Sequence, residues 1–131
     1  MIVDTSAIVA IMRDEPGHEE IARTIRAAQS AKMSAATAVE LYAVLDVRGE
    51  PAQSRRVDAV LAELGVEIVG FTPRQAAIAR EAYRDYGRGS GAAAKLNLGD
   101  VFAYALAADT GEPLIFVGDD FTHTDLERAI G

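Results

Sequence analysis

The chain opens with Met1-Ile2-Val3-Asp4-Thr5-Ser6-Ala7-Ile8-Val9-Ala10-Ile11-Met12, and the fold can be worked out from these residues. Ile2 and Val3 followed by Asp4 predict a short buried strand, residues 2–4, that ends at a carboxylate. Ser6 is a suitable N-cap for a helix, whose apolar side would be formed by Ile8, Val9, Ile11 and Met12. A buried strand that leads directly into a helix is the repeating unit of parallel sheets.

The rest of the chain repeats this alternation. Further strands are predicted at 32–34, 66–69 and 114–117. Helices are predicted at 18–29, 36–48 (closed by Gly49), 51–64, 73–86 and 100–110, with a short last helix after Phe121. In the predicted helix 51–64, a stripe that should face the core is formed by Val57, Val60, Leu61 and Leu64. The pattern predicts an α/β fold with a parallel sheet covered by helices on both faces.

Composition limits the function. Of 131 residues, 20 are acidic and 13 basic, so the net charge of −7 argues against a general nucleic-acid coat protein. It does not exclude a nuclease, because a bound metal ion supplies positive charge locally. The absence of cysteine excludes disulfides and thiolate metal sites. No apolar run approaches the ~20 residues of a membrane span, and no signal peptide is recognisable, so we expect a soluble cytoplasmic protein.

Acidic residues recur where the predicted strands end and helices begin. Asp4 and the pair Asp119-Asp120 follow strands, whereas Glu40 and Asp100 lie near helix starts. In parallel α/β sheets ligands bind at the carboxyl ends of the strands. Two carboxylates 4 Å apart repel by about 4 kcal/mol at an effective dielectric of 20. A divalent ion such as Mg²⁺ would remove that repulsion, so these positions predict a metal-dependent site for phosphodiester cleavage.

Each acid also has a structural alternative. Asp4 could cap the first helix, and Thr37-x-x-Glu40 matches a capping box. Asp100 could be favoured by a helix macrodipole, and Asp119 and Asp120 by a turn. The hydroxyls of Thr5 and Ser6 could position a metal-bound water or cap a helix, and the cations Arg88 and Lys95, which flank a glycine-rich loop, could contact RNA phosphates or be solvated.

Four segments resemble one known family: residues 2–7 (Ile-Val-Asp-Thr-Ser-Ala), 38–41 (Ala-Val-Glu-Leu), 96–107 (Leu-Asn-Leu-Gly-Asp-Val-Phe-Ala-Tyr-Ala-Leu-Ala) and 118–121 (Gly-Asp-Asp-Phe). They are similar to PIN-domain proteins, above all to VapC-type toxins of bacterial type II toxin–antitoxin pairs. The resemblance implies a single PIN domain over residues 1–131, with a three-layer α/β/α arrangement and a central parallel sheet of four to five strands.

The resemblance also implies an activity and partners. It implies an endoribonuclease dependent on Mg²⁺, with Mn²⁺ as a substitute, with Asp4 and Asp100 as metal ligands and Glu40 as a third acid. The fourth acid is Asp119 or Asp120, because Gly118-Asp119-Asp120 departs from the single-Asp turn of many relatives. A VapB-type antitoxin that inserts a basic side chain among the acids is implied as partner, together with an RNA substrate and a homodimer.

Three alternative functions are also compatible with an α/β fold of this kind. A phosphoacceptor receiver domain also binds Mg²⁺ at the rim of a parallel sheet, but here a single Asp ends the first strand and no Lys follows residues 114–117. A haloacid-dehalogenase-like phosphatase would need an acid in place of Ser6. A non-catalytic binding protein on a nuclease-like fold is disfavoured by the intact set of acids.

Overall fold

A computed structural model describes residues 1–46 and 51–130. Its strands are β1 (Ile2–Val3), β2 (Ala31–Ser34), β3 (Val66–Val69) and β4 (Leu114–Ile115). Its helices are α1 (Thr5–Met12), α2 (His18–Ala27), α3 (Ala35–Asp46), α4 (Pro51–Leu64), α5 (Pro73–Tyr86) and α6 (Asp100–Thr110). The predicted alternation of strands and helices is confirmed, whereas the predicted closure of the third helix at Gly49 lies outside the described residues.

All strand pairs are parallel, and the order across the sheet is β3-β2-β1-β4. Ile2 of β1 is in register with Lys32 of β2 on one side and with Leu114 of β4 on the other. Strands β2 and β3 therefore lie on one side of β1, and the last strand, β4, pairs with its other side. The crevice between β1 and β4 is a topological switch point, the usual ligand site of open α/β sheets. Receiver domains have the order 2-1-3-4-5, so the sheet argues against that alternative.

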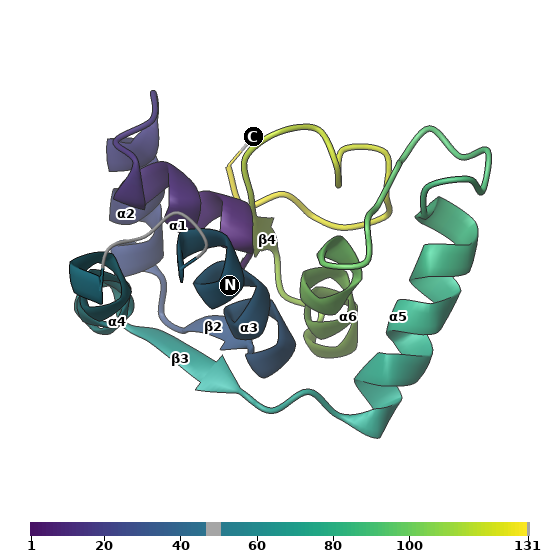
Figure 1. Ribbon diagram of the computed structural model, residues 1–131. Coiled ribbons are helices and arrows are strands. Elements are labelled where there is room, and N and C mark those ends of the chain that lie inside the picture. The colour runs from purple at the N-terminus through teal and green to yellow at the C-terminus, as the bar shows by residue number, and fades with distance from the viewer. Residues whose placement is uncertain (47–50, 131) are drawn as a thin grey trace.

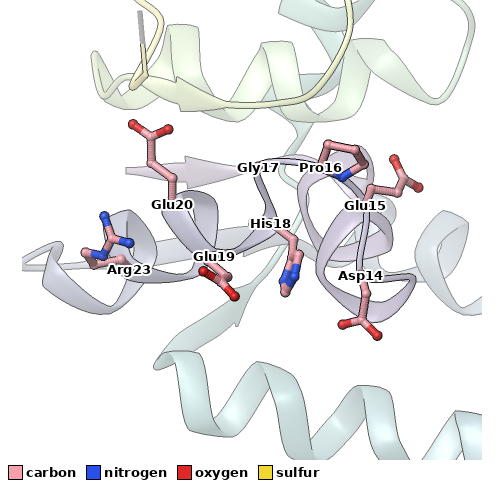
Figure 2. A pocket seen from close by; sticks show the side chains of 8 residues that line it. All are labelled: Asp14, Glu15, Pro16, Gly17, His18, Glu19, Glu20 and Arg23. Atoms are coloured by element: carbon pink, nitrogen blue, oxygen red, sulfur yellow. The ribbon is translucent and has the colours of Figure 1, made fainter.

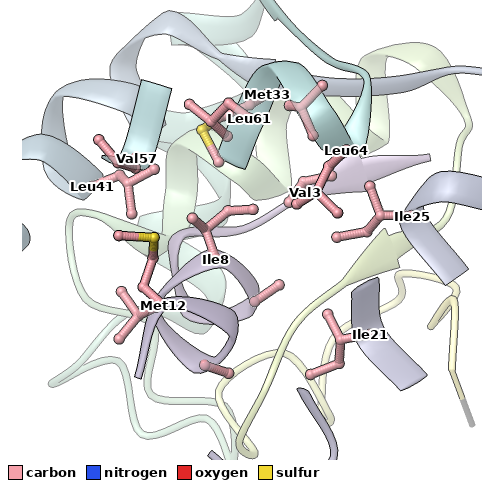
Figure 3. Packing of buried hydrophobic residues seen from close by; sticks show 14 of the residues in the cluster. Val3, Ile8, Met12, Ile21, Ile25, Met33, Leu41, Val57, Leu61 and Leu64 are labelled. Carbon is pink, nitrogen blue, oxygen red and sulfur yellow. The ribbon is translucent and has the colours of Figure 1, made fainter. Parts of the chain in front are cut away.

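The two residues of β1 face opposite sides of the sheet and enter different cores. Val3 packs with α1, α2, α3 and α4, as Figure 3 shows through the labelled side chains Ile8, Ile25, Leu41 and Leu61. Ile2 packs with α5 and α6 on the other face. Figure 1 shows α5 and α6 together on one side, away from α1, α2 and α4. The predicted three-layer α/β/α arrangement is thus confirmed.

The sequence pattern correctly predicted which residues of α4 face the core. Val57, Leu61 and Leu64 are buried and Val60 is partly buried, as their helical spacing predicts. The start of α5 is also as expected, because Thr72 Oγ1 accepts a hydrogen bond of 3.1 Å from the backbone N–H of Gln75 and Pro73 follows at the first helical position.

The predicted short last helix is wrong. Residues after Phe121 form turns in which Thr124 Oγ1 donates to the Phe121 carbonyl over 2.7 Å, a local side-chain bond that competes with helix formation. The chain then runs beside β4, where the Leu114 N–H donates to the Glu127 carbonyl and the Ala129 N–H to the Leu114 carbonyl, each over 2.9 Å. Backbone groups that a helix would have paired internally are satisfied by the sheet edge instead.

Strand β4 is also shorter than predicted, since it spans two residues in place of the four at 114–117. Within residues 1–46 and 51–130, no helix is long and apolar enough to cross a membrane.

Candidate active site

Acidic side chains from four separate parts of the chain gather at the switch point. Asp4 directly follows β1, Asp120 lies in the turn after β4, Asp100 is the first residue of α6, and Glu40 lies on α3. The pKa of Asp100 is raised from 3.8 to about 7, first by burial and then by the charges of Asp4, Asp120 and Glu40. Asp4, Glu40 and Asp120 are therefore within electrostatic reach of Asp100.

The two oxygens of Asp4 have different surroundings. Oδ2 caps α1, because it accepts hydrogen bonds from the Ser6 N–H over 3.1 Å and from the Ser6 hydroxyl over 2.6 Å. The predicted Ser6 cap is therefore wrong by two residues. Oδ1 is buried and has no hydrogen-bond partner among the described residues. Burial raises the pKa of Asp4 to about 6, against the hydrogen bonds from Ser6, and the charge of Glu40 raises it as well.

The half-buried Glu40 faces the site and does not cap its helix. Helix α3 begins at Ala35, and Ser34 Oγ accepts a hydrogen bond from the Ala36 N–H over 3.2 Å, so the helix starts before the predicted capping box. Glu40 Oε1 instead accepts a hydrogen bond of 2.7 Å from Thr5 Oγ1. The capping-box alternative for Glu40 is therefore wrong, and the role of Thr5 is to hold this carboxylate.

Gly99 makes room for the Glu40 carboxylate. A Cβ atom at this position would overlap Oε2 and the carboxyl carbon of Glu40 and lie 3.1 Å from Oε1. The backbone at Gly99 has φ −63° and ψ −37°, values open to any residue, so a side chain at this position is opposed by the neighbouring carboxylate and not by the backbone conformation. Sequence reasoning did not single out Gly99, and its only signal was the segment Leu-Asn-Leu-Gly-Asp that carried the family resemblance.

Asp100 is fixed by a reciprocal pair of hydrogen bonds. Its Oδ2 accepts from the Asn97 N–H and its own N–H donates to Asn97 Oδ1, each over 2.9 Å. This pairing places the carboxylate in the first turn of α6, as the macrodipole alternative expected. The side chain is 6% exposed, so it serves the helix end and still lies within the acidic cluster.

Ser6 connects the beginning of the chain to the turn after β4. Its hydroxyl donates to Asp4 and accepts a hydrogen bond of 3.0 Å from the Val117 N–H, one residue before Gly118-Asp119-Asp120. Both aspartates of that turn are exposed. The charge of Asp120 acts on Asp100, whereas Asp119 is not among the groups that do so. The pKa of Asp100 therefore favours Asp120 over Asp119 as the member of the pair that lies nearer to Asp100.

The residues fit a hydrated divalent cation. No group of three His, Asp or Glu side chains in the described part of the chain encloses a ready-made metal cage. Mg²⁺ does not require one, because it keeps several waters and usually binds through one or two carboxylates. Such an ion could be bound by the unpartnered Oδ1 of Asp4 and the neighbouring carboxylate of Asp100. Both groups are negative in their ionised form, so a bound cation would relieve their repulsion.

A second acid-rich hollow, of about 570 Å³, lies at the turn between α1 and α2. Figure 2 shows that its side chains point apart, with Glu15 and Glu20 on one side and Asp14 and His18 on the other. Its carboxylates do not converge on a common point, so it does not compete with the switch point as the candidate site.

The comparisons with known proteins agree with this geometry. Residues 1–127 match the family model of the PIN domain. The chain is 51% identical over 129 residues to the ribonuclease VapC42 of Mycobacterium tuberculosis, which covers 98% of both chains. Solved structures share the fold. One is VapBC2 from Rickettsia felis bound to a promoter DNA fragment, with a TM-score of 0.75 and 15% identity, and the match covers 97% of this chain and 95% of that chain. Another is Mycobacterium tuberculosis VapC20, described as a sarcin-ricin-loop-cleaving toxin, with a TM-score of 0.73 and 16% identity over 95% of each chain. The chain therefore belongs to the PIN-domain family, among the VapC proteins.

Proposed function

We propose that this chain is the toxin of a type II toxin–antitoxin pair and a Mg²⁺-dependent endoribonuclease that hydrolyses RNA phosphodiester bonds. The observation that carries the proposal is the cluster of Asp4, Glu40, Asp100 and Asp120 at the switch point, in which a buried Asp4 oxygen lacks any partner in the described residues. A buried, unpaired carboxylate oxygen is costly unless a ligand completes it. The high identity to a relative named as a ribonuclease supports the same reaction.

Asp4 and Asp100 would hold the metal ion, and Mn²⁺ should substitute for Mg²⁺. When bound, the ion lowers the pKa of a water molecule and stabilises negative charge that develops on the phosphate. Glu40 has one oxygen held by Thr5 and the other directed at Gly99, so its position is set before substrate arrives. We assign it to orienting the attacking water and accepting its proton. Hydrolysis transfers the water oxygen to phosphorus, breaks one P–O bond and returns a proton to the leaving oxygen.

Asp120 is the better choice for the fourth acid. It lies close enough to influence the pKa of Asp100, and it is exposed, so it can approach an ion or substrate as the turn adjusts. Asp119 is exposed as well, but its charge is not among the main ones that raise this pKa. We therefore assign Asp120 to the site and Asp119 to the turn.

The proposal includes protein partners. A VapB-type antitoxin would silence the site by placing a basic side chain among the acids, which relieves their mutual repulsion as a cation does. Exposed apolar side chains support a protein partner nearby: Leu98 is 64% and Tyr83 41% exposed, and both border a groove of about 330 Å³. We also propose a homodimer, which light scattering would test, and a cytoplasmic location, where RNA and antitoxin are present.

The test is RNA cleavage by purified, antitoxin-free protein with Mg²⁺. Asp4→Asn and Asp100→Asn should each reduce the cleavage rate by at least about a hundredfold, because each removes a charge that the metal requires. Circular dichroism should show an unchanged fold, and EDTA should abolish activity of the parent. Parent-like cleavage by Asp4→Asn would refute the assignment.

Neighbouring aspartates provide a matched control. Asp120→Asn should slow cleavage, whereas Asp119→Asn, which makes the same chemical change one residue away, should leave it within about twofold of the parent. If the two variants exchange these effects, the register proposed for the fourth acid is wrong, although the ribonuclease proposal stands.

A further inference from the structure

A cleft lies beside the acidic cluster and is not used by the reaction proposed above. Its volume is about 690 Å³, and it is lined by Arg88, Gly89, Gly91, Ala92, Lys95 and Asp120. That volume is within the range of small-molecule sites, about 300–1,000 Å³. Asp120 belongs both to this wall and to the proposed acidic site, so the cleft borders the proposed cleavage site.

The loop that forms the cleft is anchored at its base. The Arg88 N–H donates to the Leu96 carbonyl over 3.0 Å, and the Leu96 N–H donates to the Tyr86 carbonyl over 2.9 Å. Leu96 is fully buried, so both ends of the loop are tied to the core. Arg88 and Lys95 are the first and last residues between these bonds, and the anchored base therefore brings two cations to the same wall.

Glycine shapes the loop between the two cations. Gly89 and Gly91 have φ values of 86° and 85°, in the left-handed region where other residues are strained. Between them, the Ser90 N–H donates to the Gly87 carbonyl over 3.1 Å. Because the lining residues between Arg88 and Lys95 are two glycines and an alanine, backbone and two cationic side chains form most of the wall.

The two cations are available to a ligand. Arg88 and Lys95 are exposed, and across residues 1–46 and 51–130 neither forms an ion pair or a side-chain hydrogen bond. The chain as a whole carries a net charge of −7, which repels RNA. Two cations beside the acids oppose that repulsion at the place where an RNA strand must pass.

We propose that this cleft binds the backbone of single-stranded RNA next to the scissile bond, with Arg88 and Lys95 contacting phosphates. The inference rests on the proposed ribonuclease function and identifies how that site holds its substrate. None of the described residues that line the cleft is aromatic, so these residues offer no stacking platform for bases. Its contribution to affinity is therefore electrostatic and independent of base sequence.

The test measures RNA binding, so that it does not depend on cleavage. Every protein carries Asp100→Asn to prevent cutting, and the dissociation constant of a fluorescein-labelled single-stranded RNA is measured by anisotropy over a series of salt concentrations. Arg88→Gln with Lys95→Gln should weaken binding by about tenfold and reduce the slope of log affinity against log salt by about 1.4, since each phosphate contact contributes about 0.7. Oligonucleotides of different sequence should be affected equally.

Two control proteins separate charge from folding. Arg88→Lys with Lys95→Arg keeps both charges and should keep the salt slope. Arg23→Gln removes an exposed charge from α2, which Figure 1 shows far from the loop after α5, and should leave the affinity unchanged. The melting temperatures should agree among all of them, because neither loop side chain has an intramolecular polar partner in the described residues.

The outcomes are distinct. An unchanged dissociation constant and salt slope in the glutamine variant overturns the inference. So does weaker capture of the antitoxin with unchanged RNA binding, which would assign the cleft to the protein partner. Failure of the proposed function shows differently, as absence of cleavage by the parent protein, and leaves the binding measurement interpretable.

Discussion

Replacement of Gly99 by Ala tests how the third acid is positioned. The new methyl group would occupy the place of Glu40 Oε2, which must retreat by about 1.6 Å before the two atoms are 3.0 Å apart. The backbone itself accepts alanine, since φ is −63° and ψ −37°. The atoms that must move are the end of a flexible side chain, so the change displaces the carboxylate and spares the fold.

Stability and activity should therefore respond unequally. Displacement of Glu40 breaks its 2.7 Å hydrogen bond from Thr5, and a bond to a charged group contributes about 1.5–3 kcal/mol. Alanine recovers about 0.4–1 kcal/mol by restricting the unfolded chain. The net loss is of the order of 1 kcal/mol, a shift of a few degrees in Tm. Misplacement of a reacting group by 1 Å can reduce the rate by about a hundredfold, and a similar loss is expected here.

The assay pairs single-turnover RNA cleavage with thermal denaturation, and Glu40→Asp supplies the decisive background. Aspartate is shorter by one methylene, so its carboxylate withdraws from position 99. Alanine there should cost about a hundredfold beside Glu40 and little beside Asp at position 40, a strong non-additivity. Cleavage by Gly99→Ala within threefold of the parent, or an equal penalty in both backgrounds, refutes the idea that this contact positions Glu40.

Two further predictions concern the charges and the link across the switch point. In EDTA, the free energy of unfolding should fall as pH rises from about 4 to 7, because the pKa values of Asp4 (about 6) and Asp100 (about 7) exceed 3.8 and the folded state therefore binds more protons than the unfolded chain. In urea titrations, Asp100→Asn should reduce the dependence of the free energy of unfolding on pH. A stronger dependence in the variant would contradict the raised pKa of Asp100. Ser6→Ala should cost about 1 kcal/mol and slow cleavage by about tenfold, because it removes hydrogen bonds to Asp4 and from Val117. Ser6→Thr keeps the hydroxyl, and equal losses in both variants would show that the bonds are unimportant.

The predictable part of the fold rests on periodic apolar residues. The spacing of Val57, Leu61 and Leu64 located the buried face of α4, because a stripe of that width can be satisfied only by a core. The first strand could be predicted because the apolar pair Ile2-Val3 is followed by Asp4, a polar residue at the point where a helix begins. Such signals are local, and tertiary contacts reinforced them.

The errors arose where two local patterns coincide or a distant segment decides. Thr37-x-x-Glu40 has the spacing of a capping box, but α3 begins at Ala35, so Thr37 lies inside the helix and Glu40 bonds Thr5 instead. The sequence of the last segment predicts a helix, but in the structure its backbone forms hydrogen bonds with Leu114 at the edge of β4. The role of Gly99 depends on a side chain 59 positions earlier, which no local pattern encodes.

The link between Ser6 and Val117 has a consequence for the order of events during synthesis. The two residues are separated by 111 positions. The Asp4 N–H likewise donates to a distant group, the Ile115 carbonyl, over 3.1 Å. A chain still being translated lacks β4 until Ile115 has been added. A domain generally folds as a unit, so the acids of the first half would stand in a nascent chain without Asp120 or the crevice wall. An enzyme proposed to attack RNA would thus be harmless to the message and ribosome producing it until its last segment closes against its first strand.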